Sequence, residues 1–189
     1  MDRRVQYTKQ VLKEAFFELL KEKPVSKISV TDLCEKANIN RGTFYTHYLD
    51  IYDLYDKLCS EILQEIINEL EYVGPNKECH EPVYNILEMI NKQRDLFFTI
   101  IKWEDNDSIL ERLFILFHDK FIAMISNDFK LDNLKYIDYC YQFIIGGSIA
   151  VITNWIKNGY KADVKVIGDC LITLSHNGFS QYLNNTKKS

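Results

Sequence analysis

Apolar residues recur at helical spacing along almost all of the 189 residues. Between residues 7 and 22 they fall at i, i+1, i+4, i+5, i+8 and i+9, which is one face of an amphipathic helix: Val11, Leu12, Ala15, Phe16, Leu19 and Leu20. Seven glycines and three prolines are too few for the many tight turns of an all-β fold. The pattern predicts an all-α protein.

Local signals place the ends of the first helices. Lys23-Pro24 ends the first helix, because proline cannot continue one. Ser29, followed by Asp32 three residues later, resembles a capping box, in which side chain and backbone at a helix start bond each other. This signal predicts a second helix over residues 30–37.

A tight turn separates the second helix from a third. Asn38 tolerates the left-handed backbone conformation that follows a helix, and Asn40 can cap a third helix over residues 41–48. Phe44 and Tyr48 share one face of this helix at i, i+4 and can be buried together. Two short helices joined by a tight turn predict a helix-turn-helix, whose second helix enters the major groove of DNA.

The other side chains of the third helix suit contacts with double-stranded DNA. Hydroxyl and imidazole groups can donate to phosphate oxygens, arginine can reach a phosphate or a guanine edge, and glycine permits a close backbone approach. The candidate contacts are Arg41, Gly42, Thr43, Tyr45, Thr46 and His47. Residues 1–48 hold nine Lys/Arg against six Asp/Glu, whereas the chain as a whole carries a net charge of −4. This asymmetry favours a basic module that meets a polyanion.

The remaining sequence predicts a connecting helix and a second helical domain. We expect a DNA-binding domain over residues 1–50, a connecting helix over 51–72 and a ligand-binding and dimerisation domain over 73–189. Within the last, helical periodicity covers residues 83–93, 95–103, 108–128, 132–157 and 163–183.

The segment from Ser29 to Tyr48, SVTDLCEKANINRGTFYTHY, resembles the DNA-binding signature of the TetR family of transcriptional regulators. The resemblance extends over residues 5 to about 60. It implies that Tyr45 contacts the DNA backbone, with Thr43 and His47 beside it, and that Thr31 begins the helix that crosses the backbone. The stretch from residue 143 to residue 159 looks like the C-terminal region of a subgroup that includes regulators of dihydroxyacetone metabolism.

Two positions depart from the family pattern. Asn38 stands where the family has a glycine in the turn, which asparagine tolerates. Ile51 stands where a lysine is common at the start of the fourth helix. The phosphate contact of that lysine is therefore in doubt, and its loss lowers the salt dependence of binding by about one unit.

The resemblance also implies a homodimer that binds a palindromic operator, with the helices at about 132–157 and 163–183 forming the contact between subunits. Aromatic side chains are concentrated between residues 97 and 155, more than a simple bundle needs, and predict a pocket for an apolar or aromatic small-molecule effector. The candidate ligand contacts are Phe97, Phe98, Trp103, Phe114, Phe117, Phe121, Tyr139 and Phe143.

Other classes of protein fit the sequence less well. It has no nucleophile–base pair and no phosphate-cradling loop, and Cys79-His80-Glu81 are too close together to converge on one ion, so we expect no enzyme, metal or cofactor. The odd number of cysteines and the absence of an apolar run of about 18 residues predict a cytoplasmic protein outside the membrane. Four cysteines are expected to be buried and inert: Cys34, Cys59, Cys140 and Cys170. A co-regulator or activator of the same fold, acting through a protein partner, remains an alternative, which Ile51 keeps open.

Overall fold

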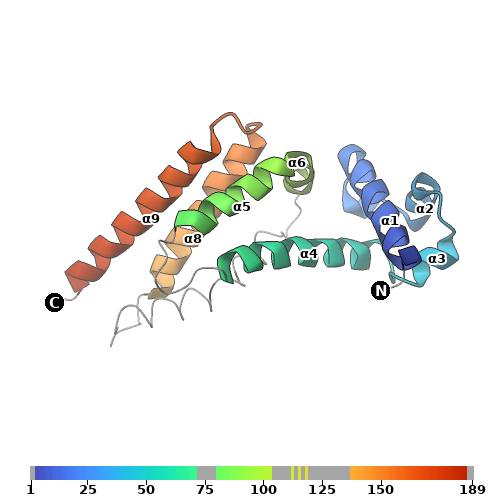
Figure 1. Ribbon diagram of the computed structural model, residues 1–189, viewed down its shortest axis with the longest axis horizontal. Helices are drawn as coiled ribbons and strands as arrows, with labels where there is room; N and C mark the ends of the chain where they lie inside the picture. Colours follow the sequence, from blue (N-terminus) through green and yellow to red (C-terminus); the bar gives the residue numbers. More distant parts are fainter. Residues whose placement is uncertain are drawn as a thin grey trace. The chain divides into compact units, whose positions relative to one another are not determined.

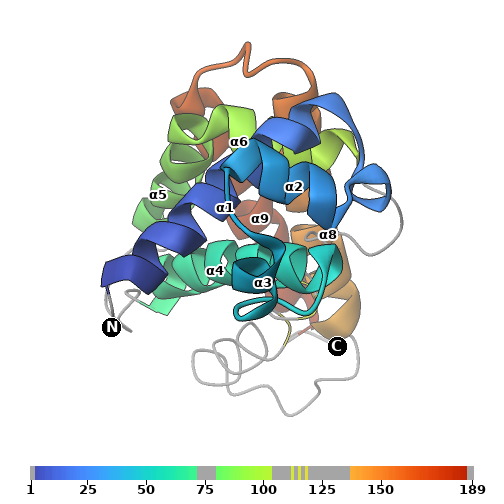
Figure 2. The same ribbon diagram turned by 90° about the vertical axis from the view of Figure 1, so that its right-hand side faces the viewer.

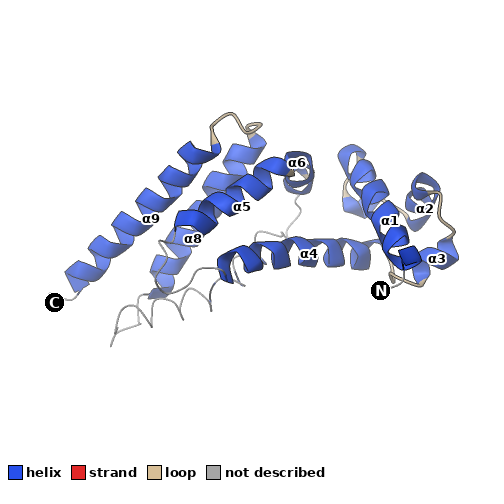
Figure 3. Cartoon of the chain, viewed as in Figure 1, coloured by secondary structure: helices blue, strands red, loops and turns tan. Residues whose placement is uncertain are grey.

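The computed structural model describes residues 3–71, 80–103, 112, 115, 118 and 137–186. Over these residues the chain is helical and contains no strand (Figure 3), which confirms the predicted all-α class. The chain divides into two compact units. The first contains Met1–Ile67 with Asp95–Glu104, and the second contains Asn68–Arg94 with Asp105–Ser189.

The first unit is built around the N-terminal helices (Figure 1). Its elements are α1 (Arg3–Glu22), a 3-10 turn (Val25–Lys27), α2 (Val30–Ala37), α3 (Arg41–Tyr45), most of α4 (Ile51–Glu71) and most of α6 (Arg94–Lys102). Figure 2 brings α1, α2 and α3 to the front, where α2 packs against both of its neighbours. One buried cluster joins α1 to α4: Leu12, Ala15, Phe16, Leu19, Leu20, Ile28, Leu33, Cys34, Ala37, Phe44, Tyr48, Ile51, Leu54 and Leu58.

The end of α6 is attached to the end of α1. The indole N–H of Trp103 donates a hydrogen bond to the carbonyl oxygen of Leu20 at 2.5 Å. Phe97 and Ile101, on the same stretch, are also buried. Residues 95–104 therefore belong to the same compact unit as the helix-turn-helix.

The second unit packs α5 (His80–Lys92) and α8 (Ile137–Lys157) against α9 (Val164–Thr186). In Figure 1, α8 and α9 run side by side and are joined by a short turn. In this turn Gly159 has φ +73° and Tyr160 φ +57°, both left-handed. The Tyr160 hydroxyl donates to the carbonyl oxygen of Arg94 at 2.9 Å, and its ring packs edge-on against Trp155. These contacts tie the α8–α9 turn to the start of α6.

A glycine allows the close approach of α5 and α9. A Cβ added at Gly168 would lie 2.3 Å from Cε1 of Tyr84. The Tyr84 hydroxyl forms a short hydrogen bond with Asp169, which also raises the pKa of the tyrosine. Gly168 is thus required by packing and not by backbone conformation.

One expected helix boundary differs from the described fold, and one expected helix is largely not tested by it. The first helix begins at Arg3, four residues before the predicted start. Apart from residues 112, 115 and 118, the helix predicted over 108–128 lies outside the described residues. Among the described helices, none combines the length and apolar character that crossing a membrane requires.

Candidate nucleic-acid interface

The helix-turn-helix begins with a complete capping box at the start of α2, as predicted. The Ser29 hydroxyl accepts the Asp32 N–H, and the Asp32 carboxylate accepts the Ser29 N–H, both at 3.1 Å. Lys23 Nζ lies 2.7 Å from the same carboxylate oxygen. The Lys23 ammonium, followed by the two Ser29 groups, lowers the pKa of Asp32 to about 2. These interactions fix the start of α2 and leave Thr31 exposed on its first turn.

The turn between α2 and α3 uses its two asparagines as the sequence predicts. Asn38 adopts the left-handed conformation, with φ 52° and ψ 46°. Asn40 caps α3, because its Oδ1 accepts the Gly42 N–H at 2.7 Å. A Cβ at Gly42 would lie only 3.2 Å from this oxygen, so that glycine leaves room for the cap.

The recognition helix α3 is shorter than the sequence indicates. It ends at Tyr45, and the prediction that it continues three residues farther is wrong. The Thr46 hydroxyl donates to the carbonyl oxygen of Thr43 at 2.6 Å, and the His47 N–H donates to that of Phe44 at 2.9 Å. The backbone N–H of Thr46 also donates to the Thr43 carbonyl oxygen, at 3.3 Å, so the backbone bonds of Thr46 and His47 have the i to i+3 spacing that is frequent at helix ends.

Buried aromatic side chains anchor α3 to the first unit. Phe44 is fully buried and Tyr48 is 6% exposed, as predicted. Tyr45 packs edge-on against Phe44, with ring centroids 5.4 Å apart, yet remains 51% exposed. The helix therefore presents one fixed face outward.

The predicted DNA contacts are gathered on α2, α3 and the turn that follows α3, all in the first unit. Five of them are exposed: Thr31, Arg41, Gly42, Tyr45 and Thr46. Thr43 and His47 are half-buried. The helix-turn-helix thus carries hydroxyl and guanidinium groups at an accessible surface, with a half-buried imidazole beside them, and their contact with DNA stays a prediction.

A clamp between α4 and the end of α3 was not predicted from the sequence. Lys57 Nζ donates to the carbonyl oxygen of His47 at 3.2 Å and to the Asp53 carboxylate at 2.8 Å. Asp53 also accepts the Leu49 N–H at 2.8 Å. Lys57 lies 5.2 Å from the centroid of the Tyr48 ring. The same two side chains therefore hold the whole link between the recognition helix and α4.

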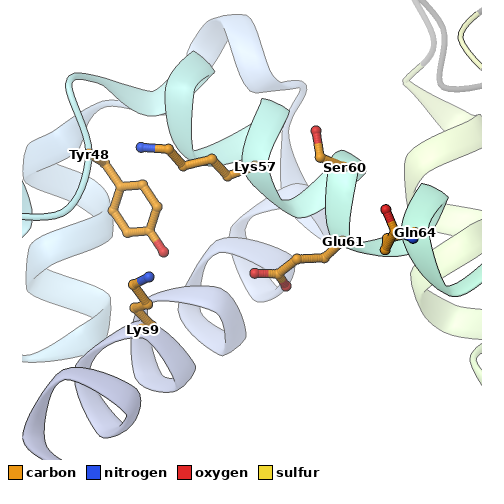
Figure 4. A pocket seen from close by; sticks show the side chains of 6 residues that line it. All are labelled: Lys9, Tyr48, Lys57, Ser60, Glu61 and Gln64. Carbon is orange, nitrogen blue, oxygen red and sulfur yellow. The ribbon is translucent and has the colours of Figure 1, made fainter. Parts of the chain in front are cut away.

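A surface cavity of about 350 Å³ lies beside this clamp, between α1 and α4. It is lined by Lys9, Tyr48, Lys57, Ser60, Glu61 and Gln64 (Figure 4). The Glu61 carboxylate is paired with Lys13 at 3.1 Å. In Figure 4, the Tyr48 hydroxyl points toward the Lys9 amine, while Lys57 lies on the other side of the ring. The cavity therefore brings two cations next to the link that follows α3.

The described members of the predicted effector site belong to two different units. Phe97, Phe98 and Trp103 belong to the first unit, where Phe97 is buried and Phe98 is 42% exposed. Tyr139 and Phe143 lie on α8 of the second unit, 67% and 77% exposed. Three further candidates lie outside the described residues: Phe114, Phe117 and Phe121. An effector site formed by this set stays a prediction.

The remaining candidate groups have structural contacts. His118 Nε2 lies 3.2 Å from the Asp138 carboxylate, and its ring packs edge-on against Tyr141. Cys34 and Cys59 are buried as expected, but Cys170 is exposed on α9, so its assignment to the core is wrong. No group of three potential metal ligands occurs among the described residues, which exclude Cys79.

The C-terminal part of the chain identifies its family. The family described as the transcriptional regulator C-terminal region of TetR-type proteins matches residues 77–177, more than half of the chain. The chain belongs to the TetR family of transcriptional regulators. The N-terminal helix-turn-helix is accordingly the DNA-binding element of a TetR-family regulator.

Two curated relatives are also helix-turn-helix regulators. The transcriptional regulator YxbF of Bacillus subtilis is 28% identical over 152 residues, which cover 77% of this chain and 40% of the relative. The dhaKLM operon transcriptional activator DhaS of Lactococcus lactis is 27% identical over 112 residues, which cover 52% of this chain and 57% of the relative. The chain thus spans about half the length of the curated relatives that it matches.

Solved structures of TetR-type regulators share the fold. A TetR transcriptional regulator from Streptococcus agalactiae has a TM-score of 0.71 at 26% identity, covering 92% of this chain and 96% of that chain. The dihydroxyacetone kinase operon activator DhaS has a TM-score of 0.66 at 16% identity, covering 90% of this chain and 95% of that one. NalD of Pseudomonas aeruginosa has a TM-score of 0.65 at 17% identity, covering 92% of this chain and 97% of that one. The last two comparisons establish the fold alone.

Proposed function

We propose that this TetR-family regulator is a homodimeric repressor that reads a palindromic operator with α3 and is released by a small-molecule effector. The observation that carries the proposal is the division of α3 into two faces. Phe44 is fully buried, while Arg41 and Tyr45 are exposed on a helix that is capped at its start by Asn40. An exposed arginine and tyrosine on a rigid helix have the chemistry needed to contact a duplex.

Each exposed group has a specific role in this proposal. The hydroxyls of Thr31, Thr43 and Tyr45, together with the His47 imidazole, donate to phosphate oxygens. The two base-edge contacts come from Arg41 and from the methyl group of Thr46, whose hydroxyl already donates within α3. Gly42, which is exposed, allows the backbone of α3 to approach the groove closely.

The apolar surface of the second unit supports a homodimer. On α8, Tyr139 and Phe143 are exposed, and on α9, Val166 and Leu174 are 59% and 63% exposed. Exposed apolar side chains that gather on the helices of one unit are candidates for an interaction site. Pairing residues 132–157 and 163–183 with a second copy would bury these side chains. A palindromic operator then requires the two recognition helices to lie about 34–36 Å apart, one turn of DNA.

The effector part of the proposal rests on chemistry alone. We assign DNA contact to residues 1–50, transmission to residues 51–72, and effector and dimer contacts to residues 73–189. An apolar or aromatic effector that binds one arrangement of the dimer better than the other changes DNA affinity. To change DNA affinity a hundredfold, the effector must bind the two arrangements with free energies that differ by about 2.7 kcal/mol.

Two substitutions test the assignment of α3. Tyr45→Phe removes one hydroxyl and Arg41→Ala removes the guanidinium, and each is expected to weaken binding to the operator about tenfold or more. Tyr7→Phe removes an exposed hydroxyl from α1 and serves as the matched control. Unchanged DNA binding in both α3 variants would exclude α3 as the DNA-reading element.

An activator is the second candidate, favoured by the relative DhaS, which is named as a transcriptional activator. In this alternative the fold acts mainly through a protein partner, and Ile51 in place of a cation weakens its own hold on DNA. Transcription in vitro from the upstream region separates the two, because a repressor lowers the amount of transcript and an activator raises it.

A further inference from the structure

We propose that Lys9 and Lys57 bind a DNA-backbone phosphate in the cavity beside the end of α3, and thereby supply the charge that position 51 lacks. This inference rests on the proposed DNA-reading function. Ile51 is 5% exposed and forms part of the core, so the start of α4 offers no cation at that position. The Lys9–Lys57 cavity, lined by the six residues named above, lies beside the link after α3, because Lys57 donates to His47 of that link.

The two lysines reach the cavity from different helices. Lys9 lies on α1, in a stretch from Arg3 to Gln10 without a buried residue. Lys57 lies on α4, and its ammonium already contacts the carbonyl oxygen of His47. The cavity is therefore built into the same unit as α3, and its position relative to the recognition helix is fixed.

The charges of the cavity favour an anion. Among the described residues, no carboxylate lies within ion-pair distance of Lys9. Lys57 uses two of its three N–H donors for His47 and Asp53, which leaves one for a ligand. The one acidic lining residue, Glu61, is paired with Lys13.

The Tyr48 hydroxyl completes the donor set. It points toward the Lys9 amine in Figure 4, so a phosphate oxygen placed there can accept from both groups. The side chain of Lys57 is 52% exposed, so its ammonium is accessible from outside the cavity. Free inorganic phosphate shares this chemistry, but only a DNA strand is brought to the cavity by α3.

The test compares salt dependence in full-length variants. Binding of a fluorescent duplex is measured by anisotropy at several salt concentrations, using DNA from the protein's own upstream region and a scrambled duplex. Lys9→Gln is expected to lower the slope of log K against log salt by about one unit per subunit, equally on both duplexes, because a phosphate contact carries no sequence information. Lys9→Arg is expected to retain the wild-type slope.

The matched control is Lys21→Gln, which removes a cation from the same helix about 18 Å farther along. It is expected to leave the slope unchanged. Lys57→Gln is measured with a thermal unfolding curve, because Lys57 also holds the α3–α4 link. In the double variant Lys9→Gln/Lys57→Gln, we expect the slope of log K against log salt to fall by less than the sum of the two single decreases, since both lysines contact one phosphate.

The outcomes separate this inference from the proposed function. Sequence-selective binding by the wild type with an unchanged slope in Lys9→Gln overturns the phosphate site and leaves the reading by α3 intact. Calorimetric binding of inorganic phosphate that Lys9→Gln abolishes, without any change in the DNA slope, also overturns it in favour of a free anion. Failure of the wild type to bind either duplex overturns both proposals.

Discussion

Lys57 of α4 donates a hydrogen bond to the carbonyl oxygen of His47, at 3.2 Å, and so ties α4 to the end of the recognition helix. Asp53 holds the same ammonium and the backbone N–H of Leu49. Because α4 also extends into residues of the second unit, any shift of α4 transmitted along the helix reaches the link after α3. The clamp is thus the contact through which a shift of α4 would reach the end of the recognition helix.

Asp53→Asn is expected to lower sequence selectivity. The amide can still accept the Leu49 N–H, but it no longer pairs with Lys57, so the end of α3 is held less firmly. Loss of a negative charge raises non-specific DNA affinity, and the ratio of operator to scrambled affinity therefore falls. Glu65→Gln removes an exposed charge farther along α4 as a control. A ratio that falls equally in both variants would contradict a role for the clamp.

The capping carboxylate of α2 makes stability depend on pH. The folded pKa of Asp32, about 2, lies below its value near 4 in an unfolded chain. Its contribution to stability is therefore complete above about pH 4 and is lost as the pH falls toward 2. Asp32→Asn should be less stable than the wild type at pH 7, with a smaller loss of thermal midpoint between pH 4 and pH 2. Glu35→Gln serves as the control. If the thermal midpoint falls equally between pH 4 and pH 2 in the wild type and in Asp32→Asn, Asp32 is not the group that makes stability depend on pH.

Gly168→Ala is expected to destabilise the second unit by about 1–3 kcal/mol, as overpacking usually does. Alanine has the better helix propensity, but its Cβ would lie 2.3 Å from the Tyr84 ring, which Asp169 holds in place. The double variant with Tyr84→Ala removes the clash and should lose less stability than the sum of the single variants. Additive losses in urea unfolding would show that the two residues do not meet.

The exposed apolar face of α8 and α9 predicts how the dimer can be broken. Phe143→Glu or Leu174→Glu places a charge on that face, and two-fold symmetry applies the change twice. We expect the dimer to weaken by more than about a hundredfold, measured by sedimentation. Leu49→Glu, a change at an exposed leucine of the first unit, should leave sedimentation unchanged. A dimer that persists in both α8 and α9 variants would contradict this interface.

Local signals in the sequence predict the first part of the helix-turn-helix well. The bounds of α2 agree with the prediction, because its start depends on Ser29 and Asp32 and its end on Asn38. The end of α3 does not agree, because the backbone N–H groups of Thr46 and His47 bond to carbonyl oxygens three residues back. The spacing of apolar residues over 41–48 fits a helix throughout and does not show where the α-helix ends.

Contacts between distant segments could not be predicted. Lys9 and Lys57 are 48 positions apart in the sequence, and only the packing of α1 against α4 places them at one cavity. Trp103 was assigned to a ligand pocket for its aromatic character, whereas its indole N–H is bonded to Leu20, 83 positions away. Residue type indicates what a side chain can bind, but the tertiary fold decides which partner it meets.

The most direct test of the account is titration of the wild-type protein against DNA from its own upstream region and against a scrambled duplex, at two salt concentrations. The account predicts tight, sequence-selective binding with two subunits per site, weakened at the higher salt concentration and weakened about tenfold or more when Arg41 is replaced by alanine. Equal weak binding of both duplexes, with no effect of Arg41→Ala, would contradict the reading of DNA by α3.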